Sequence, residues 1–152
     1  MAYVEGRIIH DADSHLMELS DCLDPYLEAR LLARYHALPG FIDRAARQKA
    51  EQARAAHADA TFRSGAESNI LLRKNYEAQG AFIADDRPAA LNALGFASQL
   101  VFTTWCLGNF GLDESGNLDL CYATAQAHNR MMADFCAVDH RFLGTGYVPL
   151  VD

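Results

Sequence analysis

The chain has 152 residues, of which 51% are hydrophobic and 22% are charged, a composition typical of one folded domain with enough apolar side chains for a core. Its formal net charge of −7 argues against nucleic acid or an anionic membrane surface as the main partner. Residues 1–7 contain no apolar leader and no run approaches the roughly 20 apolar residues that span a bilayer, so we expect a cytoplasmic protein.

The first predicted element is a β-strand over residues 7–12, and it leads into three potential metal ligands. Asp11, Asp13 and His15 occupy alternate positions, and such side chains point to one face of a strand. Carboxylate oxygens and an imidazole nitrogen suit a divalent ion, with Zn²⁺ the first choice and Mn²⁺ the alternative. Short acidic patterns also start turns and cap helices, so the pattern alone leaves both interpretations open. His10 has the opposite parity and is expected to face the helices.

Two helical segments are predicted between this strand and the next one. Residues 19–37 are expected to be largely helical, with Ser20 or Asp21 as the N-cap. Residues 43–61 are rich in Ala, Arg, Gln and Glu, which favour a helix, but they offer almost no large apolar side chain to bury. We interpret residues 38–80 as a helical insertion with a solvated helix; a lid or a subunit contact is the alternative.

A short helix and a buried strand come next. Asp85 and Asp86 can cap the helix, Pro88 suits its first turn, and Gly95 supplies its end. The apolar, β-prone run at residues 96–103 follows at once, as expected of a strand covered on both faces.

A long helix and a third strand complete the pattern. Residues 108–117 contain three glycines and predict a loop, and apolar residues at helical spacing predict a helix over residues 118–138. His128, midway along that helix, is interpreted as a packing residue rather than a ligand. A last strand is predicted from Phe142 to Leu150. The order strand, helices, strand, helix, strand indicates parallel strands joined by crossovers, and hence an α/β sheet or barrel.

Three blocks of the sequence, in this order along the chain, resemble one enzyme family. The blocks are residues 7–18 (RIIHDADSHLME), residues 87–96 (RPAALNALGF) with 99–102 (QLVF), and residues 127–135 (AHNRMMADF) with 141–144 (RFLG) and 147–149 (YVP). They resemble the amidohydrolase-related family of metal-dependent TIM-barrel enzymes, in the branch that contains aminocarboxymuconate-semialdehyde decarboxylase and related hydrolases. The resemblance covers the chain apart from residues 38–80.

The resemblance implies metal-binding roles near the first strand. In this family that strand ends in a His-x-His, Glu-x-His or Asp-x-His pair that binds the ion, which assigns metal binding to Asp13 and His15. Asp13 stands where a His is commoner in the family. Asp11 or Glu18 would then hold a ligating imidazole in its orientation.

The resemblance also implies a fold and a place for the substrate. A TIM barrel has eight strands and typically about 250 residues. Residues 1–152 are therefore expected to form the N-terminal part of a barrel with about three parallel strands, and to need the remaining strands from another polypeptide or from a self-associating chain. Thr104 and Trp105 follow the second strand and would lie at the C-terminal face of the barrel, where substrate binds.

Three functions remain open from the sequence. The first is hydrolysis of a small carbonyl or carboxylate compound by metal-activated water. The second is metal-dependent, non-oxidative decarboxylation within the same family. The third is a non-catalytic fragment that serves as an assembly module. The Asp13-x-His15 pair favours the two catalytic functions, and the small number of predicted strands favours the non-catalytic one.

Overall fold

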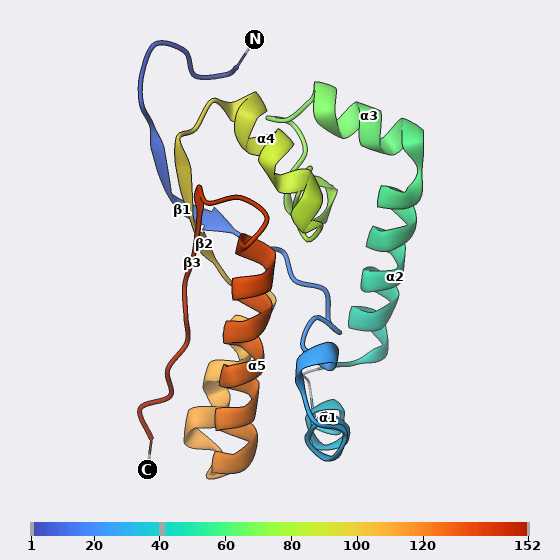
Figure 1. The fold of residues 1–152 in the computed structure, drawn as a ribbon. Helices are drawn as coiled ribbons and strands as arrows, with labels where there is room; N and C mark the ends of the chain where they lie inside the picture. The colour runs from blue at the N-terminus through green and yellow to red at the C-terminus, as the bar shows by residue number, and fades with distance from the viewer. Residues whose placement is uncertain (1, 40–41, 152) are drawn as a thin grey trace.

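The computed structural model describes residues 2–39 and 42–151, within which strands and helices alternate along the chain (Figure 1). The elements are β1 (His10–His15), η1 (Asp24–Tyr26), α1 (Ala29–His36), α2 (Arg44–Ala58), α3 (Ala60–Ser68), η2 (Asn75–Glu77), η3 (Ala84–Asp86), α4 (Arg87–Leu94), β2 (Ser98–Phe102), η4 (Trp105–Glu114), α5 (Leu118–Cys136) and β3 (Phe142–Gly144), where η denotes a 3₁₀ helix.

The strands form a parallel sheet in the order β1-β2-β3. β2 lies at the centre, where its Ser98 pairs with His10 of β1 and its Gln99 pairs with Phe142 of β3. A parallel sheet whose strands are joined through helices is an α/β fold, so this part of the prediction is confirmed. Among the described strands only β2 is paired on both edges, and the outer edges of β1 and β3 are open.

An irregularity in β1 changes which of its side chains share a face. Asp11 pairs with Gln99 and Ser14 pairs with Val101, so three steps along β1 match two steps along β2. This is the geometry of a β-bulge, which turns the side chains that follow it to the other face. Asp11 and Ser14 therefore share one face of the sheet, and His15 lies on the opposite face. The prediction that Asp11 shares a face with His15 is wrong for this reason.

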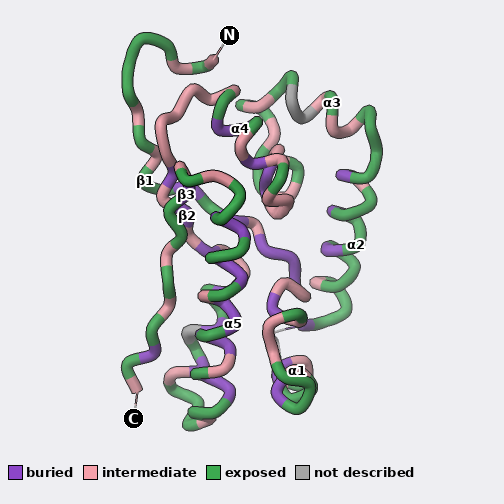
Figure 2. Tube along the Cα trace, viewed as in Figure 1, coloured by how far each residue is buried: buried purple, intermediate pink, exposed green. Residues whose placement is uncertain are grey.

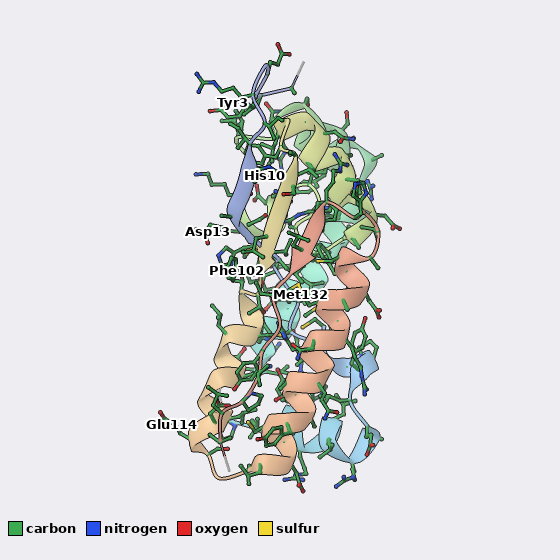
Figure 3. The ribbon with its side chains drawn as sticks, turned by 60° about the vertical axis from the view of Figure 1, so that its left-hand side comes forward. Tyr3, His10, Asp13, Phe102, Glu114 and Met132 are labelled. Carbon is green, nitrogen blue, oxygen red and sulfur yellow. The ribbon has the colours of Figure 1, made fainter. Side chains whose placement is uncertain are left out.

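Helices cover one face of the sheet. α4 and α5 lie on the same side of the strands in Figures 1 and 3. Val101 and Phe142 point to that side and belong to the main core, together with Leu91 of α4 and Leu120 of α5. On the opposite face Leu143 is 55% exposed. That face is the one left uncovered by α4 and α5.

His10 lies on this uncovered face, contrary to the prediction. It is exposed, and its Nδ1 lies 2.7 Å from Oγ of its strand partner Ser98. The prediction assumed a regular alternation from His15 back to His10. The bulge inserts one residue between them, and it places both imidazoles on the same face.

The segment after β1 is less helical than the sequence predicts. The helix expected over residues 19–37 is reduced to the single turn η1 and to α1, which begins only at Ala29. Leu23 is 1% exposed and belongs to the main core. Tertiary packing of this irregular segment overrides its helical propensity. Neither Ser20 nor Asp21 precedes an α-helix, so neither is an N-cap.

α2 and α3 stand apart from the sheet (Figure 1). α2 is capped by Asp43, whose carboxylate accepts a 2.8 Å hydrogen bond from the N–H of Ala46. Ala50 and Ala53 pack against Leu19 in a small second cluster, and most of the rest of α2 is exposed (Figure 2). The predicted helix in this region is confirmed, and its status as an insertion stays a prediction.

In the second half of the chain α4, β2 and α5 lie where the sequence predicts them, but the strand predicted from Phe142 to Leu150 is wrong beyond Gly144, where β3 ends. α4 has Pro88 in its first turn and ends at Gly95, whose φ of 79° is left-handed. A Cβ at Gly95 would collide with the carbonyl oxygen of Val4. The predicted loop at 108–117 is largely the 3₁₀ helix η4. None of the described helices is both long enough and apolar enough to cross a membrane.

Candidate functional site

A pocket of about 360 Å³ lies at the carboxyl ends of the three strands. β1 contributes Asp13 and His15, β2 contributes Phe102, and α5 contributes His128; the remaining walls come from the segments that follow β2 and β3. Figure 3 shows Asp13 and Phe102 near the same end of the sheet. This is the place where open α/β sheets and barrels bind their ligands.

Asp13 and His15 are brought together at this pocket, as the sequence predicts. Nε2 of His15 lies 3.4 Å from Oδ1 of Asp13. The other ring nitrogen of His15, Nδ1, lies 3.0 Å from the hydroxyl of Thr104. The same hydroxyl lies 3.6 Å from the sulfur of Met17. A metal ion at Nε2 requires the hydrogen of the ring on Nδ1, and in that tautomer the Thr104 hydroxyl would accept it.

The distance between these two donor atoms fits a shared metal ion. Ligands about 2.0–2.2 Å from a tetrahedral ion are separated from one another by about 3.4 Å. A carboxylate oxygen and an imidazole nitrogen also belong to the donor set of Zn²⁺ and Mn²⁺. Throughout residues 2–39 and 42–151, no group of three or more His, Cys, Asp or Glu side chains could hold an ion. Asp13 and His15 therefore fit one side of a metal site.

Asp11 does not contact the imidazole of His15 in the contacts described, although its Oδ1 accepts a 3.1 Å hydrogen bond from the backbone N–H of Asp13. Its Oδ2 accepts a 3.2 Å hydrogen bond from the side-chain amide of Gln99, its partner in the sheet. Gln99 is 4% exposed and faces the helices. The predicted role of Asp11 in orienting the His15 imidazole has no support in these contacts, because the bulge places Asp11 on the other face.

A buried arginine supports the end of β1, and sequence reasoning did not single it out. Arg87 is 7% exposed, and its Nε donates to Gln99 Oε1 at 3.1 Å. Its Nη1 donates to the carbonyl oxygens of His15 (3.1 Å) and Gly80 (2.9 Å), and its Nη2 donates to Oγ of Ser14 (2.5 Å). Arg87 thus fixes the backbone at His15 from the covered side of the sheet.

Glu18 is 2% exposed, and it holds the loop after β2 rather than the imidazole itself. Its carboxylate accepts hydrogen bonds from the hydroxyl of Thr103 and from the backbone N–H groups of Thr104 and Trp105, the last two at 2.8 Å. Because the Thr104 hydroxyl contacts His15, Glu18 positions the imidazole indirectly. Burial raises the pKa of Glu18 above its ordinary value of 4.5, and the backbone N–H groups oppose that shift.

The raised pKa of Glu18 gives a stability prediction with a definite sign. The folded state binds the Glu18 proton more tightly than the unfolded state, so this group's contribution to stability falls as pH rises from about 4.5 through the raised pKa. Each unit of the shift lowers the free energy of unfolding by about 1.4 kcal/mol. Urea denaturation between pH 4 and pH 8 should show this fall for the native chain and not for Glu18→Gln. Glu28→Gln, at an exposed position, should behave as the native chain, and a rise in stability with pH relative to Glu18→Gln would contradict the prediction.

Thr104 and Trp105 do not line the pocket, although both were predicted to contact substrate. Thr104 contacts His15 directly, as described above. Trp105 is half-buried, packs against the main core, and uses its backbone N–H to bind Glu18. Both residues follow β2 as predicted, but Thr104 supports the site through its hydroxyl and Trp105 through its backbone N–H.

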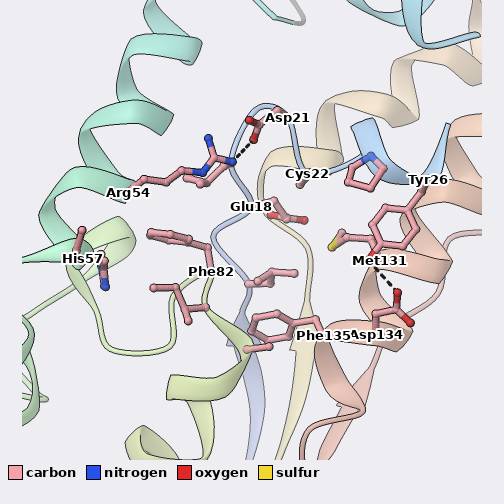
Figure 4. A pocket seen from close by; sticks show the side chains of 16 residues that line it. Glu18, Asp21, Cys22, Tyr26, Arg54, His57, Phe82, Met131, Asp134 and Phe135 are labelled. Carbon is pink, nitrogen blue, oxygen red and sulfur yellow. Dashed lines mark hydrogen bonds and ion pairs between the residues drawn. The ribbon is translucent and has the colours of Figure 1, made fainter. Parts of the chain in front are cut away.

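A larger cavity of about 670 Å³ lies between α2 and α5 and is mostly apolar (Figure 4). Its polar groups are already paired: Arg54 with Asp21 at 2.6 Å, Tyr26 with Asp134 at 2.9 Å, and His57 with the Tyr76 carbonyl at 2.7 Å. Polar groups that satisfy one another have little left to offer a ligand. We therefore place the functional site in the smaller pocket at the ends of the strands.

Comparisons with known proteins do not assign the chain to a family. No protein-family model matches it, and no curated protein matches it. The case for a function must therefore come from the geometry of the site and from the motifs in the sequence.

Proposed function

We propose that the chain is part of a divalent-metal-dependent hydrolase of the amidohydrolase-related family, acting in the cytoplasm on a small carbonyl or carboxylate compound. Zn²⁺ is the first choice of ion and Mn²⁺ the alternative. The observation that supports this proposal most directly is the Asp13–His15 pair, with donor atoms 3.4 Å apart beside a pocket at the carboxyl ends of parallel strands.

Each of the named residues has a definite task in this proposal. Asp13 and His15 would hold the ion, which when bound polarises a carbonyl oxygen and lowers the pKa of water. Thr104 would accept the Nδ1 hydrogen of His15, which leaves the Nε2 lone pair for the ion. Glu18 holds the backbone at Thr104, and Arg87 holds the backbone at His15. The ligand pair is thus supported from two directions.

Asp13 and His15 provide only two ligands, and the remaining strands of the proposed barrel would supply the others. In a TIM barrel the helices lie outside, and the inner strand faces meet at the centre. Here α4 and α5 cover one face, and His10, His15 and Leu143 lie on the other, which would be the inner face. The open edges of β1 and β3 would pair with further strands, from another polypeptide or from a second copy of the chain. Those strands would bring the remaining ligands.

Metal titration tests the proposal directly. We expect isothermal titration calorimetry at pH 7 to show one Zn²⁺ or Mn²⁺ bound per chain. Asp13→Ala and His15→Ala should each weaken this binding by at least about tenfold, because each removes a ligand. His10→Ala is the matched control, since this exposed imidazole is on the same strand and does not line the pocket. Binding that survives both ligand substitutions would contradict the proposal.

A non-catalytic assembly module is the second candidate function, and the uncovered sheet face favours it. Leu143 on that face is 55% exposed, and the edges of β1 and β3 are open within the described chain. The hydrolase and the assembly module differ in whether the chain catalyses a reaction. The metal-loaded assembly should hydrolyse a simple activated ester such as 4-nitrophenyl acetate if the hydrolase proposal holds. Release of CO₂ from small carboxylates would instead favour a decarboxylase, and metal-independent assembly without turnover would favour the module.

A further inference from the structure

His128 is a buried imidazole with one unused nitrogen at the candidate site. It lies on α5, is 3% exposed, and lines the same pocket as Asp13 and His15. Its Nδ1 lies 3.1 Å from Oδ1 of Asn129. Its Nε2 has no hydrogen-bond partner among the residues that the structure describes. Buried polar atoms are nearly always paired, so this nitrogen requires an explanation.

The hydrogen bonds of Asn129 fix which nitrogen of His128 carries the proton. The Asn129 amide donates to the carbonyl oxygen of Tyr147 at 2.9 Å, and its Oδ1 accepts from the backbone N–H of Tyr147 at 2.7 Å. These two bonds settle the orientation of the amide, since a flipped amide would place donor against donor. Oδ1 can only accept, so Nδ1 of His128 must carry the hydrogen. Nε2 of the neutral ring then carries a lone pair.

The surroundings favour the neutral ring. Burial lowers the pKa of His128, and the hydrogen bond to Asn129 only partly opposes this shift. An unsatisfied acceptor in a buried position costs free energy, and a ligand that donates a hydrogen bond to it recovers that cost. The lining of the pocket therefore includes a residue with one unsatisfied acceptor nitrogen.

We propose that His128 is a substrate-binding residue, whose Nε2 accepts a hydrogen bond from a hydroxyl or N–H group of a small molecule in this pocket. The inference deepens the proposed function and rests on it for one point, that the carbonyl oxygen of the same molecule lies toward Asp13 and His15. The substrate class is thus a compact carbonyl compound with a donor group near its carbonyl carbon.

The remaining walls agree with a ligand of this kind. Phe102 and Leu107 present apolar side chains, and Thr103 and Thr145 belong to the same lining. A volume of about 360 Å³ is at the small end of the range for ligand pockets. Nε2 itself is covered in the free chain, so a donor group reaches it only with a movement of the surrounding side chains.

Two probes test the proposal, and they differ in whether the group beside the carbonyl can donate a hydrogen bond. Hydroxyacetone carries a hydroxyl beside its carbonyl, and methoxyacetone carries a methyl ether there, which cannot donate. Each is titrated into the ¹⁵N-histidine-labelled chain, with and without Zn²⁺. We expect the free chain to show the Nδ1–H tautomer at His128, and hydroxyacetone to shift its Nε2 resonance. Hydroxyacetone should bind about fivefold more tightly than methoxyacetone, the effect of one hydrogen bond.

Substitutions separate this role from a structural one. His128→Phe should abolish the preference for hydroxyacetone, and His57→Phe should keep it, because His57 is also a buried imidazole but lies outside this pocket. If His128→Phe fails to fold, the comparison of the two probes on the native chain decides. Equal affinity for both probes, an unmoved His128 resonance, or a hydrogen on Nε2 would overturn the inference.

The same spectra distinguish failure of the inference from failure of the proposed function. Zn²⁺ alone should move the His15 resonances if His15 binds the ion. A response at His15 with none at His128 on adding hydroxyacetone would overturn only the role of His128. If hydroxyacetone shifts the His128 resonance but Zn²⁺ does not shift the His15 resonances, the proposed metal site is wrong and the role of His128 in binding stands.

Discussion

Arg87→Met should lower the free energy of unfolding by about 3–4 kcal/mol. The substitution keeps an unbranched side chain of similar reach, but it removes the donors that bind Gln99, Ser14 and the carbonyl oxygens of His15 and Gly80. Buried acceptors that lose their donor cost about 1–3 kcal/mol each. Urea denaturation at pH 7 measures the change. Lysine should not rescue it, because one ammonium group cannot reproduce the planar fork of a guanidinium.

An exposed arginine provides the control for this prediction. Arg30 has a 68% exposed side chain, and it lies 3.5 Å from Glu28 in a surface ion pair. Arg30→Met should change the free energy of unfolding by less than about 0.5 kcal/mol. If Arg87→Met had a similarly small effect on the free energy of unfolding, the hydrogen bonds of Arg87 would contribute little to stability, which would contradict the prediction. Because Arg87 holds the backbone at His15, its substitution should also weaken metal binding under the proposed function.

Leu120→Ala should cost about 3 kcal/mol of unfolding free energy. Leu120 is on α5, is 0% exposed, and belongs to the main core. Truncation of a fully buried leucine removes its burial and leaves a cavity, a change that costs 2–5 kcal/mol in typical cores.

Leu118 supplies a control from the same helix. It is 36% exposed, so Leu118→Ala should cost well under half as much as Leu120→Ala in the same denaturation experiment. Equal losses at the two positions would mean that α5 does not bury Leu120 in the main core as described.

The parts of the fold that sequence predicts well are those that depend on local signals. Pro88 and Gly95 bracket α4 because a proline suits the first turn and a left-handed residue ends it. The apolar periodicity of α5 is likewise a property of the segment itself. The segment after residue 19 was mispredicted because Leu23 is buried by distant parts of the chain, and that burial overrides local propensity.

The candidate site was predictable only in part, for the same reason. Asp13 and His15 are close in sequence, so their meeting at one pocket follows from the pattern. The bulge that separates Asp11 from them depends on pairing with β2, which the order of residues in β1 does not reveal. His128 gave no signal either, because an unpaired Nε2 becomes visible only when its surroundings in space are known. The hydrogen bonds of Arg87 also join residues far apart in the sequence, and Ser14 is the most distant of its partners.

The separation of β1 from β2 along the chain bears on how the protein folds. His15 and its hydrogen-bond partner Thr104 are 89 positions apart, and contacts of such long range slow folding. The backbone hydrogen bonds of α2, by contrast, are local, so this helix can form early. A ribosome adds about 5–20 residues per second. During synthesis, several seconds would therefore pass between the addition of His15 and that of its partner Thr104, and the site would be among the last features of the chain to acquire its native form.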